Sequence, residues 1–233
     1  MGSPTFQFKQ FTIAHDRCAM KVGTDGVLLG AWARGGDRIL DVGTGTGVIA
    51  LMMAQRFPSS RVTAIDIDEG AVRQATQNVQ QSPYHDVVEV MHQSVQEFAA
   101  LASQRPALTA SFDAIVSNPP FFIDSLSAPN AQRNMARHAD TLSYAELMQA
   151  SWQLLGDDGE LSVVVPFDYR QRMEDEATFA GFFPHRVCAV RTTDRKPARR
   201  YLLAFGKHPC QCERTEMTIG DSLYQQLTGD FYL

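Results

Sequence analysis

The hydrophobic and polar positions of this chain alternate between two periodicities. Short apolar runs rich in β-branched residues predict strands, and seven of them occur, over 38–42, 62–66, 87–91, 112–117, 161–165, 186–191 and 201–205. Stretches with helical spacing lie between them and predict helices over 46–56, 69–80, 95–102, 143–155 and 169–180. Strands that alternate with helices favour a mainly parallel sheet with helices on both faces. We therefore expect an α/β fold.

The two ends of the chain interrupt this alternation. A short link containing Pro197 joins the last two predicted strands, so we expect them to pair antiparallel. The expected sheet thus has seven strands, mostly parallel, with an antiparallel last strand. Before the first strand, four apolar residues between Phe6 and Ile13 predict a hairpin or edge strand. A helix should follow over 24–32, with Thr24 or Asp25 as its cap.

Composition narrows the class of protein. A chain of 233 residues, 44% hydrophobic and 20% charged, fits one domain. No apolar run is long enough for a membrane span, and no signal-peptide pattern precedes the hairpin, so we expect a cytoplasmic protein without a membrane partner. Cys210 and Cys212 form a C-x-C pair rather than the C-x-x-C pairs typical of zinc sites, so we expect no metal.

A glycine-rich segment, Asp41 to Gly47, follows the first strand and precedes a helix. Glycines let the backbone turn sharply and approach a ligand, and a helix N-terminus offers free amides. The stretch from Gly45 to Ala50 fits the G-x-G-x-x-G/A pattern of NAD(P) enzymes, which must be weighed. The alternating glycines, with an acid two residues before them, instead resemble motif I of class I methyltransferases. That resemblance implies S-adenosylmethionine as the cofactor, held by Asp41, Gly43, Thr44, Gly45 and Gly47.

Further candidate cofactor residues follow the next two strands. Asp66 ends the second strand, where a carboxylate can accept both ribose hydroxyls. Ile67 is a candidate for packing on the adenine or for the core, and Asp68 is a candidate helix cap. Ser94, with Val95 beside it, occupies the position at which the family places an acid for the adenine. Ser94 is equally placed to cap its own helix.

The tetrapeptide Asn118-Pro119-Pro120-Phe121 follows the fourth strand. Ligands of open α/β sheets bind at this edge, and two prolines make a stiff arm. The Asn118 side-chain oxygen and the Pro119 carbonyl can accept the two hydrogens of an amino group, while Phe121 can stack on a planar substrate. These four residues resemble the [N/D/S]-P-P-[Y/F/W] motif of enzymes that methylate adenine, cytosine or glutamine amides. They are the candidate catalytic residues, and Asn118 would also contact the cofactor.

A longer resemblance identifies the amine. Residues 15–32 are very similar to the N-terminal signature of the bacterial tRNA1(Val) adenine-N(6) methyltransferases, and the likeness continues through 133–138 and 200–205. It implies transfer of a methyl group to the adenine 3′ of the anticodon in a valine tRNA. Residues 1–36 would then be an extension that caps the cofactor site of a methyltransferase domain at 37–233. The residues of the extension implied in cofactor binding are Lys21, Gly23, Thr24 and Asp25.

Basic residues are candidates for contact with tRNA, although the chain has a formal net charge of −5. One set lies in the long segment after Phe121 and another lies between 186 and 200, where Asp194 is the one acid. The candidates are Arg133, Arg137, Arg195, Lys196, Arg199 and Arg200. Each is equally compatible with an ordinary solvated charge.

Three other functions remain possible at this stage. A protein glutamine-amide methyltransferase would carry a similar tetrapeptide, but usually has a helical domain for which about 37 residues leave little room. An NAD(P)-dependent oxidoreductase would share the glycine segment. A nucleic-acid-binding module without activity would retain the pocket alone. None of these patterns implies an obligate protein partner or fixes the oligomeric state.

Overall fold

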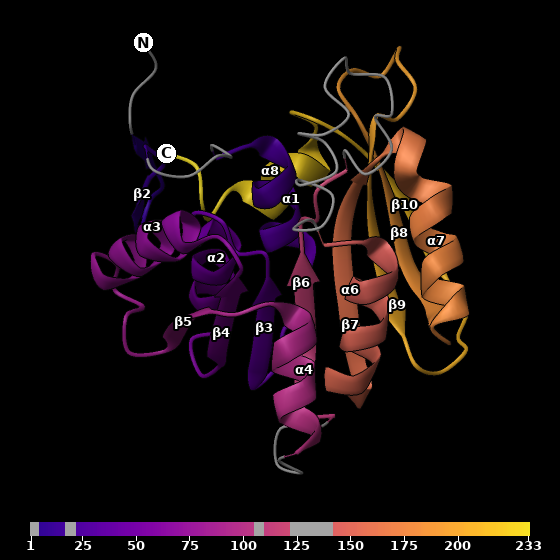
Figure 1. Cartoon of the computed structure of the whole chain (residues 1–233). Helices are drawn as coiled ribbons and strands as arrows, with labels where there is room; N and C mark the ends of the chain where they lie inside the picture. Colours follow the sequence, from indigo (N-terminus) through magenta and orange to yellow (C-terminus); the bar gives the residue numbers. More distant parts are fainter. Residues whose placement is uncertain (1–4, 17–21, 105–109, 122–141) are drawn as a thin grey trace, which may run out of the picture.

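The computed structural model describes residues 5–16, 22–104, 110–121 and 142–233, and its main feature is an eight-stranded sheet (Figure 1). The strands lie in the order β10-β8-β9-β7-β6-β3-β4-β5. Their bounds are β3 (Arg38–Val42), β4 (Arg61–Asp66), β5 (Val88–His92), β6 (Phe112–Ser117), β7 (Leu155–Pro166), β8 (Phe183–Arg191), β9 (Arg200–Gly206) and β10 (Glu213–Thr218). Strand β9 is antiparallel to both of its neighbours, and the other pairs are parallel.

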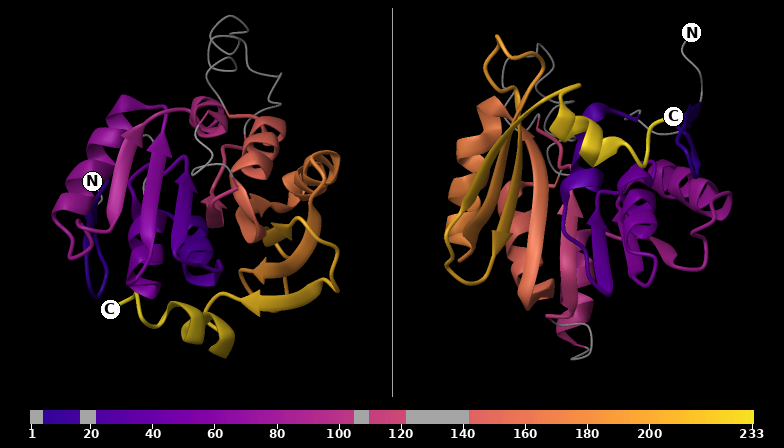
Figure 2. Two further views of the ribbon diagram at one scale, coloured as in Figure 1. Left: turned by 90° about the horizontal axis from the view of Figure 1, so that it is seen from below. Right: turned by 180° about the vertical axis from the view of Figure 1, so that it is seen from behind.

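Helices cover both faces of this sheet, and the two hydrophobic clusters of the core lie between helices and sheet. Helices α4 (Val95–Ser103), α6 (Tyr144–Leu154) and α7 (Arg170–Phe179) stand in front in Figure 1. Helices α1 (Thr24–Trp32), α2 (Val48–Arg56), α3 (Glu69–Gln80) and α8 (Ser222–Thr228) contribute to the other cluster, and the right-hand view of Figure 2 shows α1 and α8 from that side. This confirms the predicted α/β class with helices on both faces.

The predicted strand count of seven is wrong, because β10 adds an eighth strand beside β8. Its sequence, from Glu213 to Thr218, contains a single hydrophobic residue, Met217, which is buried. A strand at the edge of a sheet needs few apolar side chains, so periodicity does not reveal it. Helix α8 was also not predicted.

The starts of two helices differ from the prediction, one in its first residue and one in its cap. Helix α2 begins at Val48 rather than at residue 46, because Gly47 adopts a left-handed conformation with φ of 81°. Helix α1 begins at Thr24 as expected, but its N-cap is Gly23, and no side chain caps it. The Asp25 carboxylate instead accepts a hydrogen bond from Arg200.

The N-terminal extension forms the predicted hairpin, of β1 (Thr5–Gln7) and β2 (Thr12–Ala14). Asn78 on α3 holds it in place: its side-chain oxygen accepts from the Ala14 amide, and its Nδ2 donates to the Ala14 carbonyl. The same Nδ2 donates to the carbonyl of Thr46, at 2.8 Å. One buried amide therefore links the hairpin to the glycine segment.

The C-terminal segment packs on this hairpin. The Lys9 amide donates to the Phe231 carbonyl at 2.8 Å, and the Phe231 side chain is 1% exposed.

None of the helices in the described part of the chain has the length and hydrophobicity that a membrane span requires.

Phe231→Ala is expected to lower the free energy of unfolding by about 3–5 kcal/mol, because it leaves a cavity in a packed core. Urea titration measures this change. Leu233→Ala is the matched control, since the Leu233 side chain is 80% exposed and its loss should cost less than about 0.5 kcal/mol. Equal effects of the two variants would contradict the structural role of Phe231.

Candidate cofactor and substrate site

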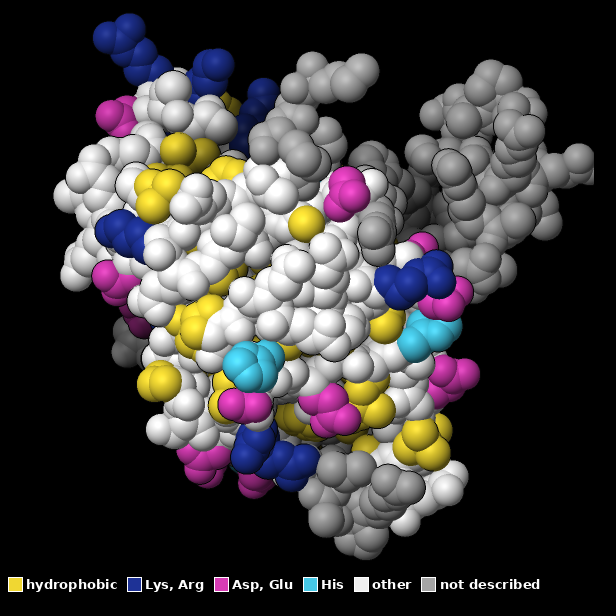
Figure 3. Space-filling view, turned by 90° about the vertical axis from the view of Figure 1, so that its left-hand side faces the viewer, with side chains coloured by type: hydrophobic (Ala, Val, Ile, Leu, Met, Phe, Trp, Pro, Cys, Tyr) yellow, Lys and Arg dark blue, Asp and Glu magenta, His cyan; other side chains and the backbone are white. Residues whose placement is uncertain are grey.

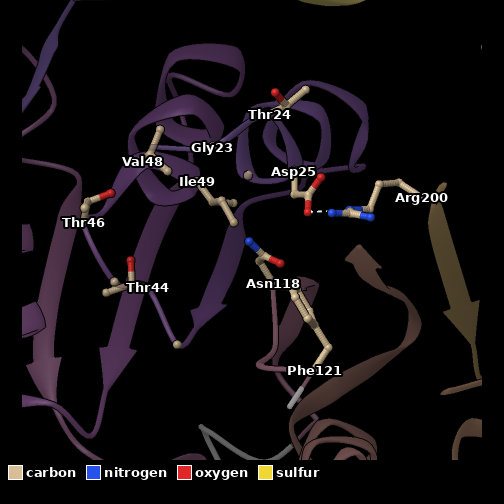
Figure 4. Close-up of a pocket in the computed structure, with 13 residues that line it drawn as sticks. Gly23, Thr24, Asp25, Thr44, Thr46, Val48, Ile49, Asn118, Phe121 and Arg200 are labelled. Carbon is tan, nitrogen blue, oxygen red and sulfur yellow. Dashed lines mark hydrogen bonds and ion pairs between the residues drawn. The ribbon is translucent and has the colours of Figure 1, made fainter. Parts of the chain in front are cut away.

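A cavity of about 290 Å³ opens at the carboxyl edge of the sheet (Figure 4). Four parts of the chain line it: the start of α1, the glycine segment with the start of α2, the segment after β6, and the start of β9. Its lining residues are Gly23, Thr24, Asp25, Gly26, Gly43, Thr44, Gly45, Thr46, Val48, Ile49, Asn118, Phe121 and Arg200. The structure therefore brings seven of the fourteen predicted cofactor residues and two of the four catalytic candidates to one cavity. The predicted cofactor residues that the structure describes and that do not line it are Asp41, Gly47, Asp66, Ile67, Ser94 and Val95.

The glycine segment owes its path to three left-handed residues. Gly43, Gly45 and Gly47 have φ values of 71°, 56° and 81°, a region that residues with a Cβ atom rarely adopt. The amides of Gly43 and Thr44 both donate to the carbonyl of Ile65 on β4. The segment is thus fixed to the end of the neighbouring strand, with its backbone against the cavity.

Asp41 lies behind this segment rather than in the cavity. Its side chain is fully buried, and one oxygen, Oδ2, accepts from the Thr44 hydroxyl at 2.6 Å and from the Ala50 amide at 3.1 Å. Its other oxygen has no partner in the described part of the chain. Burial raises the pKa of Asp41 to about 7. The carboxyl group therefore ties the glycine segment to α2, and it is poised to gain or lose a proton near neutral pH.

This raised pKa predicts that stability depends on Asp41 between about pH 4 and pH 7. In that range the folded protein keeps a proton that the unfolded chain, with an ordinary pKa of 3.8, has released. The free energy of unfolding should therefore fall as pH rises through this window, by up to a few kcal/mol, and level off above it. Asp41→Asn cannot titrate, so its curve should lack this fall.

Urea titrations of both proteins from pH 4 to pH 8 measure the effect. All other titrating groups are common to the two proteins, so the difference between their curves isolates Asp41. Parallel curves would contradict the raised pKa.

Asp66 ends β4 and faces the same segment. Its Oδ2 accepts from the Gly45 amide at 2.8 Å, and its Oδ1 accepts from the Asp68 amide at 2.9 Å. Burial raises the pKa of Asp66. Asp68 caps α3 through the Ala71 amide, as predicted. The neighbouring Ile67 side chain is 47% exposed, so it is accessible to a ligand rather than part of the core.

Ser94 is the N-cap of α4. Its hydroxyl accepts a hydrogen bond from the Glu97 amide, and the Glu97 carboxylate accepts one from the Ser94 amide. Together these two bonds form a capping box. The structure thus bears out the capping interpretation, while contact of Ser94 with adenine stays a prediction. Val95, next to it, is buried.

The Asn-Pro-Pro-Phe segment continues directly from β6. The Ser117 hydroxyl donates to the Val42 carbonyl at 2.8 Å, which joins the end of β6 to the end of β3. Beyond it, Asn118 and Phe121 project toward the cavity, whereas Pro119 is buried. The Oδ1 atom of Asn118 is buried and makes no hydrogen bond within the described residues. Buried acceptors are normally hydrogen-bonded, so this oxygen is available to a donor from a bound ligand.

An ion pair that the sequence did not indicate crosses the cavity. The Arg200 Nε donates to Asp25 Oδ2 at 2.7 Å, and the two residues are 175 positions apart (Figure 4). Arg200 also donates to the carbonyl of Arg199. This pair joins the start of α1 to the start of β9, and both residues line the cavity.

The other basic residues between 186 and 200 differ in their surroundings. Arg195, Lys196 and Arg199 are exposed on the connection between β8 and β9, at the same edge as the cavity. Arg186 and Arg191, from the same basic stretch, bind Glu160 and Glu216. Lys21, Arg133 and Arg137 lie outside the described residues.

Some lining residues escaped prediction. Thr46 lies within the glycine segment, and Val48 and Ile49 begin the helix that follows it, so their position in or beside the motif was the available signal. Gly26 directly follows Asp25, the last residue of α1 that was predicted to bind the cofactor. No group of three or more His, Cys, Asp or Glu side chains suited to a metal occurs in the part of the chain that the structure describes.

Comparison with known families gives a consistent result. A family model described as the methyltransferase small domain matches residues 22–180. A tRNA1(Val) (adenine(37)-N6)-methyltransferase from Bacteroides fragilis is 45% identical over all of this chain and 99% of its own length. The protein of the same name from Mannheimia succiniciproducens is 38% identical over 99% of this chain and 95% of its own.

Solved structures share the fold at low sequence identity. A protein of Agrobacterium tumefaciens described as a predicted O-methyltransferase is 15% identical, with a TM-score of 0.67, over 89% of this chain and 96% of that one. The TrmN protein of Thermus thermophilus is 22% identical, with a TM-score of 0.53, over 78% of this chain and 47% of that one. These likenesses concern the arrangement of the sheet and helices.

Proposed function

This chain belongs to the methyltransferase small domain family and to the tRNA1(Val) (adenine(37)-N6)-methyltransferases within it, and we propose on that basis that it methylates N6 of adenine 37 in tRNA1(Val). The observation that carries the chemistry is the buried Oδ1 of Asn118 at the wall of the cavity, which has no hydrogen-bond partner among the residues that the structure describes. Such an acceptor fits an exocyclic amine.

The residues around the cavity suit S-adenosylmethionine. Asp66 would accept the ribose hydroxyls, the backbone of Gly43 to Gly47 would pass beneath the ribose and the carboxypropyl chain, and Ile67 would cover the adenine. Asp41 would not contact the cofactor itself but would hold the glycine segment in place through its hydrogen bond with Thr44. Residues 1–36 would cap the cofactor, since Gly23 to Gly26 line the cavity. The cofactor supplies a methyl group already activated by a positively charged sulfur.

Methyl transfer then needs alignment more than a strong base. The two hydrogens of the adenine amino group bind the Asn118 side-chain oxygen and the Pro119 carbonyl, which directs the nitrogen lone pair at the methyl carbon. Attack by this nitrogen would form the nitrogen–carbon bond as the sulfur–carbon bond of bound S-adenosylmethionine breaks, and the electron pair of the broken bond would stay on sulfur. One amino proton leaves to water. Phe121 stacks on the adenine, worth ~1–3 kcal/mol, once the base has turned out of its loop.

The charge of the surface favours a local contact with tRNA rather than a general one. Figure 3 shows a face on which acidic and basic side chains are interspersed, while Lys and Arg side chains gather at its upper edge. The exposed Arg195, Lys196 and Arg199 stand beside the cavity at the carboxyl edge. We propose that these three side chains bind phosphate groups of the tRNA. We also propose that the enzyme acts in the cytoplasm, where its substrate is found.

Replacing Arg195, Lys196 and Arg199 with Gln is expected to weaken tRNA binding and to reduce the slope of log affinity against log salt concentration by about two. Fluorescence anisotropy with labelled tRNA between about 50 and 200 mM salt measures both.

The matched control removes three other exposed charges, Arg61, Arg73 and Arg214. Arg61 and Arg214 lie near the amino-terminal ends of β4 and β10, at the opposite edge of the sheet. This control should keep the wild-type slope. An unchanged slope in the first variant would remove the connection between β8 and β9 from the tRNA interface.

The function itself is tested with labelled S-adenosylmethionine and a tRNA1(Val) transcript. We expect label in N6-methyladenosine at position 37, and none in a transcript with guanine there. Label in a protein substrate instead of RNA would overturn the proposal in favour of a glutamine-amide methyltransferase.

A further inference from the structure

Phe167 is an exposed aromatic side chain at the edge of the sheet that carries the cavity. It follows Pro166, the last residue of β7, and begins the short 3-10 turn Phe167–Tyr169. Its side chain is 55% exposed, although most large hydrophobic residues of the strands are buried. Nothing in the proposed reaction uses it.

The position of Phe167 is fixed on two sides. Its amide donates to the Arg199 carbonyl at 3.1 Å. Its ring lies against that of Tyr201, with centroids 6.2 Å apart and planes tilted by 40°. The Arg170 guanidinium lies over the other ring, 4.4 Å from the centroid of Tyr201, and itself binds Glu174 at 2.9 Å. The exposed ring therefore rests on a supported layer, and a ligand would find it already oriented.

The same turn connects Phe167 to the reaction site. Tyr169, two residues later, contacts the Phe121 ring with centroids 6.2 Å apart. Pro166 pairs with Arg200 across β7 and β9, and the Arg200 side chain lines the cavity. Phe167 is thus attached through neighbouring residues to both the predicted stacking residue and the wall of the cavity.

Charge around Phe167 indicates what would lie on it. The connection between β8 and β9 ends at Arg199, whose carbonyl holds Phe167, and it presents the exposed cations Arg195 and Lys196. Two acids, Asp168 and Asp194, are exposed nearby in sequence, so the surface is basic without being uniformly so. A flat apolar ring beside several cations matches a nucleobase joined to phosphates, because bases stack on aromatic faces regardless of their identity.

We propose that Phe167 is a stacking platform for a second, unpaired base of the RNA, next to the adenine that enters the cavity. This inference rests on the proposed function. When the target adenine turns out of its loop, its neighbour loses a stacking partner, and the Phe167 ring replaces that partner. The platform would therefore favour substrates whose target lies in a single-stranded loop.

The test compares Phe167→Ala with Phe167→Trp on an anticodon stem-loop RNA. The Ala variant should raise KM for the RNA about tenfold, with the affinity for S-adenosylhomocysteine and the salt slope unchanged. The Trp variant should restore KM. Phe179→Ala is the matched control, since Phe179 is 86% exposed on α7 and is expected to leave KM unchanged.

Two modified RNAs give a readout that a general loss of structure would not move. An abasic nucleotide immediately 5′ or 3′ of the target adenine should raise KM for the wild type, but much less for Phe167→Ala, at one of the two positions. 2-Aminopurine at that position should be quenched on binding to wild type and not to the Ala variant. Equal abasic penalties in both proteins at both positions, or equal quenching, would overturn the stacking platform.

The inference and the proposed function can fail separately. If wild type methylates adenine 37 and Phe167→Ala has an unchanged KM, the platform alone is refuted. If wild type binds the RNA but methylates no adenine in it, the proposed function is refuted, and the platform as a substrate subsite with it.

Discussion

Asn118→Ala is expected to lower kcat for adenine methylation by about 100- to 1000-fold while leaving cofactor affinity nearly unchanged. The reason is that its Oδ1 is buried at the cavity without a partner in the described residues. An acceptor placed for a charge that develops on the amine acts in the transition state, and loss of one such group costs about this much. Single-turnover methylation of the transcript and titration with S-adenosylhomocysteine measure the two quantities.

The conservative variants sharpen this expectation. Asn118→Asp keeps two acceptor oxygens and Asn118→Ser keeps one, so both should retain more activity than the Ala variant. A kcat for Asn118→Ala within about tenfold of wild type would show that the amide oxygen does not act on the reacting amine. Full loss in all three variants together with lost cofactor binding would indicate a structural role instead.

Asp66→Ala is expected to weaken S-adenosylhomocysteine binding by at least about 100-fold. The cofactor ribose would lose two charge-assisted hydrogen bonds to the Asp66 carboxylate, each worth ~1.5–3 kcal/mol. The Gly45 amide would also lose its present acceptor, at 2.8 Å. Asp66→Asn keeps an oxygen for that amide and should lose less affinity than Asp66→Ala. Calorimetric titration measures the three affinities.

The same titration separates the methyltransferase from the oxidoreductase interpretation of the glycine segment. NAD should give no heat with the wild type, because three alternating left-handed glycines and the Asp25–Arg200 ion pair shape this cavity. NAD binding that is lost in Asp66→Ala, with no binding of S-adenosylhomocysteine to the wild type, would reverse the cofactor assignment.

The parts of the fold that could be predicted from sequence are those with strong local signals. Strands β3, β4 and β6 are buried apolar runs, and Ser143 with Glu146 forms the capping box expected at the start of α6. The motifs follow strands that end at one edge, so parallel topology brings them together. Local patterns therefore located most of the candidate site.

The rest depends on contacts between distant residues. The cavity wall formed by Asp25 and Arg200 joins two residues 175 positions apart, and neither carries a local signal for the other. Strand β10 depends on pairing with β8 rather than on its own apolar residues. Phenylalanine is usually buried in the core, and only the position of Phe167 after the end of β7 accounts for its exposure. Roles of the site residues toward cofactor and tRNA stay predictions.

The order of strands bears on how the protein is made on the ribosome. Strand β9 lies between β7 and β8, yet it is synthesised after both. Until residue 206 has emerged, β7 and β8 each lack the neighbour that pairs with their backbone, and such edges invite aggregation during translation. Arg200, which begins β9, also completes the cavity. The nascent chain therefore gains the strand that joins β7 to β8 and the residue that completes the cavity wall at the same late step.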